Sequence, residues 1–140
     1  MVELFVSKDY GMKPKITAAW EQLGAVGGTR YDLSKWTKDR STLWVTLWSD
    51  QLKRVKSGVY RYTLCEDKDL GYRTGARHHA NVCEAIERGV PMRGFLVWPN
   101  KGISAQGNRG VEDADPTRQY KVEVESRDGN LIVALAKGLQ

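Results

Sequence analysis

Long apolar runs and cysteine are scarce in this sequence, and each scarcity excludes a class of protein. No apolar run approaches the roughly 18 residues that a membrane-spanning helix needs. No N-terminal stretch combines a charged start, an apolar run and a small-residue cleavage site, as a signal peptide does. The two cysteines are too few and too far apart for a recognisable zinc motif. We therefore expect an intracellular, cytoplasmic protein with reduced thiols and no membrane association.

Charge and apolar content indicate one globular domain with an excess of cations. The sequence has 140 residues, of which 41% are apolar and 28% charged, as in ordinary globular proteins. This length favours a single domain, residues 1–140. The formal net charge is +5 at pH 7. Such a charge favours polyanionic partners, although many basic proteins carry it only for solubility.

The apolar pattern predicts mostly strands, with one long helix between them. Three- and four-residue spacing indicates a short helix over residues 16–23 and a longer one that is capped by Thr74 and stopped by Gly89. We expect an α+β fold, in which a curved, mostly antiparallel sheet of about six strands forms a partial barrel and the longer helix packs on it. Alternating residues place the strands at 1–7, 42–48, 58–65, 92–98, 119–125 and 130–136.

The longer helix and the connections give further expectations. Ala76, Ala80, Cys83 and Ile86 are spaced to form the buried stripe of the helix. Asp128-Gly129 is a typical hairpin turn between the last two strands. Residues 100–116 contain three glycines, two basic and three acidic residues and almost nothing apolar. This composition is typical of a long mobile loop, where acidic residues are solvated rather than bound to metal.

A glycine- and arginine-containing turn before the longer helix is the most informative segment. Backbone N–H groups at a helix start carry partial positive charge, and arginines beside them favour phosphate. The alternative is a capped helix whose arginines are solvated or paired with Asp67, Asp69 or Glu84. The turn lacks the spacing of known nucleotide-binding loops. The candidate phosphate-binding residues are Tyr72, Arg73, Thr74, Gly75, Arg77 and His78.

The two histidines do not predict a metal or catalytic site. His78 and His79 are adjacent, so on a helix they point about 100° apart and cannot readily hold one ion. A general base also needs a positioned nucleophile or acid beside it, and the sequence offers none. We therefore expect no metal, no cofactor and no catalytic residue.

Residues 30–62 interleave cations with aromatic side chains. This segment contains eight Lys or Arg and three Asp or Glu, a net charge of +5. Cations among aromatics suit a nucleic-acid backbone, although solvated loops give the same pattern. Two of the aromatics are tryptophans on one face of a predicted strand, where burial is favoured over exposure as stacking platforms. The candidate binding residues here are Trp44, Trp48, Lys53, Arg54 and Lys56, with Arg109 from the predicted loop.

The segment from Ser57 to Pro99, which contains SGVYRYTL and GYRTGARHHANVCEAIERGVPMRGFLVWP, resembles a known domain. It is similar to the small DNA-reading domain that accompanies HNH nuclease modules in McrA-type, modification-dependent restriction enzymes. The resemblance covers about a third of the chain. It implies duplex DNA binding, with Tyr72, Arg73 and Arg77 near the backbone or a modified base. The His/Asn/Cys set of an HNH nuclease is missing, so a binding domain alone is implied.

Three functions are compatible with these features. The first is a nucleic-acid-binding domain that holds duplex DNA through a basic face and the arginine-containing turn. The second is a small-molecule-binding protein, or a small enzyme, with an aromatic-lined cleft in the curved sheet. The third is a protein-interaction module of mobile-element or phage origin whose basic face meets an acidic partner. The first depends on whether the cations of residues 30–62 and of the turn share one surface.

Overall fold

The computed structural model describes residues 15–99 and 110–139. Within these ranges the chain forms two α-helices, two short 3-10 helices and seven strands. The helices are α2 (Ile16–Gln22) and α3 (Arg73–Arg88), and the 3-10 helices are η1 (Ser49–Gln51) and η2 (Asp67–Gly71). The strands are β1 (Ser34–Trp36), β2 (Leu43–Trp48), β3 (Lys53–Lys56), β4 (Val59–Cys65), β5 (Met92–Pro99), β6 (Val111–Asp128) and β7 (Leu131–Gly138).

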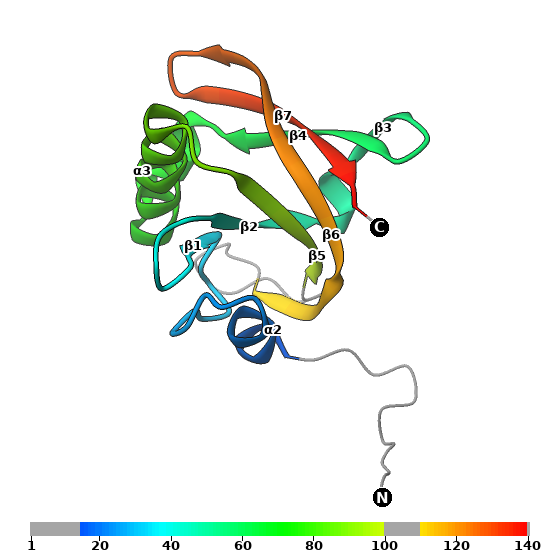
Figure 1. The fold of residues 1–140 in the computed structure, drawn as a ribbon. Coiled ribbons are helices and arrows are strands. Elements are labelled where there is room, and N and C mark those ends of the chain that lie inside the picture. Colours follow the sequence, from blue (N-terminus) through cyan, green and yellow to red (C-terminus); the bar gives the residue numbers. More distant parts are fainter. Residues whose placement is uncertain (1–14, 100–109, 140) are drawn as a thin grey trace, which may run out of the picture.

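All seven described strands belong to one sheet, in the order β1-β2-β5-β6-β7-β4-β3. Neighbours run antiparallel except β2 and β5, which are parallel. A parallel pair needs a long crossover, and here β3, β4 and α3 lie in the chain between its two strands. The sheet is not closed, because β1 and β3 are its edges. The predicted α+β class with a mostly antiparallel sheet is confirmed (Figure 1).

Most of the expected strands are present, and two short ones were missed. β2, β4, β5 and the β6–β7 hairpin match the predicted strands, and the hairpin turns at Gly129, whose φ is +60°. The strand expected over residues 1–7 lies outside the described residues. The additional strands are the sheet edges β1 and β3. Their polar and basic composition, which suits an exposed edge, hid them from an apolar pattern.

The predicted loop over residues 100–116 is wrong in its second part. Residues 111–116 are the start of β6, while residues 100–109 lie outside the described part of the chain. Val111 and Ala114 are 4% and 0% exposed, and Ala114 pairs with Val97 of β5. These two buried side chains attach the strand to the core. The acidic Glu112 and Asp113 between them are exposed to solvent, so their charges do not prevent the strand from forming.

The core is formed by apolar side chains of the sheet together with those of α2 and α3. Trp20 of α2 is fully buried and meets Phe95 of β5 edge-to-face, with ring centroids 5.0 Å apart. The Trp20 indole N–H donates to the Thr29 carbonyl at 3.0 Å, so the buried ring has no unpaired donor. Trp44 joins the same cluster, 6.4 Å from Phe95.

α3 lies against β1, β2 and β4, and the predicted buried stripe is only partly right, because Cys83 and Ile86 pack against the core but are not its most buried residues. The buried residues are Gly75, His78, Val82 and Ala85, whereas Ala80 of the expected stripe is exposed. The helix ends as predicted at Gly89, whose φ of +65° is the left-handed conformation that glycine adopts without strain. On this face Gly75 and His78 meet backbone and polar groups, whereas Val82 and Ala85 join the apolar core.

The two cysteines occupy different environments and are expected to differ in reactivity. Cys65 is fully buried, and burial, helped by Asp69 and Cys83, raises its pKa to about 12 from an ordinary 9.0. This change lowers its thiolate fraction about 1000-fold at neutral pH. Cys83 is only half-buried and accepts a hydrogen bond from Arg127 at 3.3 Å. Iodoacetamide should therefore modify Cys83 and spare Cys65 in the folded protein, which peptide mass spectrometry can check; equal modification rates would contradict this assignment.

Candidate functional site

One cleft of about 370 Å³ lies on the side of the molecule where β2 and β4 face each other. These strands are not neighbours in the sheet, yet the Trp48 backbone N–H donates to the Tyr62 hydroxyl at 3.3 Å. The cleft walls are mostly polar and aromatic, and they come from the segment before β1, from β2, η1, β4, η2 and the start of α3. The lining residues are Arg30, Tyr31, Leu33, Thr46, Trp48, Gln51, Tyr62, Thr63, Leu64, Glu66, Lys68, Asp69, Tyr72, Thr74 and His78.

Aromatic rings form both the floor and the mouth of the cleft. Trp48 and Tyr62 are 8% and 6% exposed and form the floor. Tyr31 and Tyr72 are 54% and 38% exposed and stand at the mouth. The Arg30 guanidinium lies 5.5 Å from the centroid of the Tyr31 ring, a distance at which cation and ring attract each other. The mouth therefore presents flat aromatic faces beside a cation.

His78 connects the two sides of the cleft instead of facing a ligand. It is 5% exposed, its Nε2 lies 2.7 Å from the Leu64 carbonyl and its Nδ1 lies 2.8 Å from Ser34 Oγ. A carbonyl only accepts, so Nε2–H donates to Leu64 and the Ser34 hydroxyl donates to Nδ1. Burial lowers the pKa of His78, against the opposing effect of the Leu64 bond. Both nitrogens are occupied, which corrects the prediction that His78 binds phosphate.

The start of α3 is covered by the backbone of η2, which corrects two further expectations. The helix begins at Arg73 with Tyr72 as its N-cap residue, so Thr74 is not the cap. A Cβ built on Gly75 would lie 2.1 Å from the Asp69 carbonyl oxygen. Gly75 thus allows a close backbone approach and does not form an open amide cradle for phosphate. Thr74 lines the cleft instead.

η2 itself is held by a buried carboxylate. Asp69 is 8% exposed, and its Oδ2 accepts the Glu66 backbone N–H at 2.8 Å in a capping box. The Tyr72 hydroxyl lies 3.5 Å from the other Asp69 oxygen. Burial, followed by the Asp69 charge, raises the pKa of Tyr72, so its hydroxyl is neutral at physiological pH. Asp69 therefore positions the Tyr72 ring at the mouth of the cleft.

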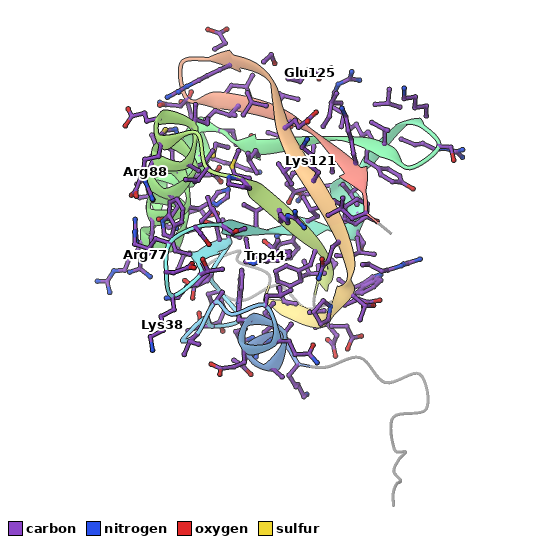
Figure 2. All side chains as sticks on the ribbon, viewed as in Figure 1. Lys38, Trp44, Arg77, Arg88, Lys121 and Glu125 are labelled. Atoms are coloured by element: carbon purple, nitrogen blue, oxygen red, sulfur yellow. The ribbon has the colours of Figure 1, made fainter. Side chains whose placement is uncertain are left out.

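The arginines of the predicted turn lie on the exposed side of α3. Arg73 is exposed, and Arg77 is 53% exposed with its guanidinium 3.6 Å from the Asp32 carboxylate. This partner is none of the three that the sequence suggested. Figure 2 shows Arg77 and Arg88 on the outer side of α3, with Lys38 beyond them on the same side of the molecule.

The cations of β3 lie elsewhere. Lys53, Arg54 and Lys56 are exposed on the edge strand β3, which Figure 1 places on the opposite side of the molecule from α3. These cations and those of the turn therefore do not form one continuous face, so the single basic surface expected from the sequence is wrong and does not support nucleic-acid binding. The cleft nevertheless borders both groups, because its walls include both neighbours of Arg73 and also Gln51, two residues before β3.

The remaining candidates divide between core, cleft and undescribed chain. Trp44 is 7% exposed and packs in the core, as favoured from the sequence, so it is not a stacking platform. Trp48 is 8% exposed and belongs to the same core, but unlike Trp44 it also lines the cleft, and Arg109 lies outside the described residues. Sequence reasoning missed Arg30, Tyr31 and Lys68. The only signal for the first two was their place in the basic, aromatic segment 30–62.

Metal-binding clusters and membrane-spanning helices are both absent from the described ranges. No group of three or more His, Cys, Asp or Glu side chains there could hold a metal ion. Nor does either described helix combine the length and apolar character needed to cross a bilayer. Comparison of the chain with protein-family models, curated proteins and solved structures found no match. The cleft geometry is thus the basis for a functional assignment.

Proposed function

We propose that this protein binds nucleic acid, with duplex DNA as its substrate, and that the cleft is the centre of the contact surface. The observation that carries the proposal is the mouth of the cleft, where the exposed rings of Tyr31 and Tyr72 are joined by two cations. Arg30 lies over the Tyr31 ring, and Lys68 is exposed and lies 3.7 Å from Glu66. Aromatic faces contact bases, and cations contact phosphates. Their combination at one opening is typical of nucleic-acid binding.

In this proposal the open sheet is a partial barrel whose open side, between its β1–β2 edge and its β3–β4 edge, is the binding surface. The phosphate backbone would cross the mouth from the start of α3, with Arg73, toward the exposed cations of β3. Each phosphate neutralised by Lys or Arg releases counterions from the polyanion. Binding should therefore weaken steeply as salt concentration rises.

Removing two cations near the mouth is expected to weaken binding at least about tenfold. The variant is Lys68→Ala with Arg73→Ala, and binding is measured by fluorescence anisotropy with a labelled duplex between about 50 and 200 mM salt. The slope of log affinity against log salt should also become shallower by roughly 0.9 for each phosphate that the variant no longer neutralises. Both residues are exposed, so their removal should leave the fold intact.

Lys121→Ala is a control that removes one cation outside the site, where the test variant removes two, since Lys121 is exposed on β6 and does not line the cleft (Figure 2). It removes the same type of charge and should change affinity less than about twofold. Absence of binding to duplex and single-stranded DNA at about 50 mM salt would refute the proposal. An equal reduction of affinity in the control would refute the assignment to the cleft.

Binding of a small neutral molecule is a second candidate, favoured by the concave shape of the site. A volume of about 370 Å³ lies within the range of small-ligand sites. A thermal-shift screen with neutral sugars, nucleosides and aromatic compounds distinguishes the two candidates. A ligand that raises Tm equally at low and high salt would favour this candidate, because counterion release would not contribute.

A further inference from the structure

We infer that the cleft accepts a single nucleobase that has been taken out of its stack. The inference rests on the proposed function and specifies what part of the nucleic acid enters the site. A cleft of about 370 Å³ is near the lower limit for small-ligand sites, about 300 Å³. A duplex cannot enter a space of this size. A base can reach the floor only if it leaves the helical stack.

The aromatic side chains are arranged at two depths, as a base entering from outside requires. Tyr31 and Tyr72 are exposed at the mouth, while Trp48 and Tyr62 are almost completely buried below. A base that leaves its neighbours loses stacking on both of its faces, and aromatic side chains can replace that stacking. Exposed rings alone could stack on a base at the protein surface. The two buried rings, Trp48 and Tyr62, are therefore the observation that indicates entry of the base into the cleft.

Tyr72 is held in place for this role. Its hydroxyl contacts the buried Asp69 carboxylate at 3.5 Å, and Asp69 is fixed in turn by the Glu66 backbone N–H at 2.8 Å. An aromatic ring that is already fixed loses less conformational entropy when a base stacks on it. The Asp69 carboxylate is thereby committed to the protein and positions Tyr72 rather than reading the base.

The polar side chains around the cleft can contact the edge of a base. Gln51 and Thr63 are exposed in the cleft wall, and an amide or a hydroxyl can both donate and accept. His78 cannot serve in this way, because both of its ring nitrogens are bonded to Ser34 and Leu64. The cations Arg30 and Lys68 at the mouth would hold the phosphates on either side of the extruded base.

The experiment uses the full chain and one DNA sequence in three forms. These are a perfect duplex, the same duplex with one central mismatch, and the single strand, each with 2-aminopurine at the central position. Emission of 2-aminopurine rises when the base leaves its stack, and anisotropy gives the affinity. We expect the mismatched duplex to bind at least about tenfold more tightly than the perfect duplex, because unstacking costs less there. We also expect emission from the perfect duplex to rise severalfold on binding.

Two substitutions of Tyr72 test whether the preference for the mismatched duplex arises in the cleft. Tyr72→Ala should abolish the preference for the mismatch while the salt dependence of binding remains. Tyr72→Phe keeps the ring but loses the hydroxyl contact with Asp69, so it should retain part of the preference. Circular dichroism and Tm establish that each variant is folded, and emission with the unaltered protein decides the question if Tyr72→Ala does not fold.

The outcomes separate the inference from the proposed function. Salt-dependent binding with equal affinity for perfect and mismatched duplexes and unchanged 2-aminopurine emission would overturn base entry and leave nucleic-acid binding standing. A mismatch preference that survives in Tyr72→Ala would place the base outside this cleft and also overturn the inference. No binding to any of the three forms at about 50 mM salt would overturn both.

Discussion

Gly75→Ala is expected to destabilise the fold by about 2–3 kcal/mol, although alanine normally stabilises a helix by about 1 kcal/mol relative to glycine. The reversal of sign follows from the contact between α3 and η2. The added Cβ would lie 2.1 Å from the Asp69 carbonyl oxygen and 2.8 Å from the Asp69 carbonyl carbon. Both atoms belong to the backbone, so no side-chain rotation can relieve the overlap.

The neighbouring structure also resists a backbone shift. The Asp69 N–H donates to the Glu66 carbonyl at 3.0 Å, and the Asp69 carboxylate accepts the Glu66 N–H at 2.8 Å. Moving Asp69 away from α3 would strain both bonds, the second of which belongs to the capping box of η2. Moving α3 instead would disturb the contacts of His78 with β1 and β4. The whole penalty of the overlap should therefore appear in the free energy of unfolding.

Urea denaturation followed by tryptophan fluorescence measures this effect. Gly71→Ala is the matched control, because a Cβ at Gly71 meets no atom within 4 Å. Its free energy of unfolding should stay within about 0.5 kcal/mol of the unaltered protein. If Gly75→Ala were as stable as the unaltered protein, the close contact between η2 and α3 would be wrong.

Stability is expected to fall as the pH drops below about 6.5, and His78 is the cause. Burial lowers the pKa of this histidine in the folded protein from an ordinary value of 6.5. Below that pH the unfolded chain binds a proton that the folded protein does not, so protons favour unfolding. Above pH 6.5 both states are neutral and the effect vanishes. The free energy of unfolding should decrease by up to about 1.4 kcal/mol per pH unit until the lowered pKa is reached.

His78→Gln should remove this pH dependence and lower stability at pH 7.5 by about 2 kcal/mol, because glutamine cannot reproduce both hydrogen bonds. Subtracting its unfolding free energies from those of the unaltered protein between pH 5 and 7.5 cancels the contribution of carboxylates. Those with lowered pKa values, such as Glu84 and Glu123, lose their stabilising effect below their ordinary 4.5. Identical pH profiles for His78→Gln and the unaltered protein would exclude His78 as the cause.

Local sequence signals predicted the elements whose own side chains determine them. β2 and β5 are rich in apolar, branched and aromatic residues, and such runs form strands in most contexts. The end of α3 at Gly89 and the turn at Gly129 need a positive φ, which glycine supplies at once. These features require no knowledge of the rest of the chain.

Features that depend on distant partners were not predictable in the same way. In the first half of α3 the predicted stripe has Ala76 and Ala80, yet Gly75 and His78 are the residues that are buried there. Glycine is there because backbone lies against it, and histidine because Ser34 and Leu64 bond it. Neither reason can be read from the spacing of apolar residues on α3 itself.

The site could be predicted only in part, because its residues are also brought together by contacts between distant segments of the chain. The arginine-containing turn does border the cleft, but the helix start is covered by Asp69, which lies before the turn in the chain. Charge counting over residues 30–62 could not show that β3 and α3 are on opposite sides of the molecule. Tyr31 and Arg30 reach the cleft from a segment without a regular pattern, so their role emerged only with the tertiary structure.

The distribution of cleft residues along the chain has a consequence for how this protein can change. Within the described part of the chain, every lining residue falls between Arg30 and His78, and β5, β6 and β7 contribute none. The second half of the chain therefore acts as a support that can stay constant while the first half diversifies. Selection for a new ligand, in nature or in a randomised library, can concentrate on one contiguous stretch of codons.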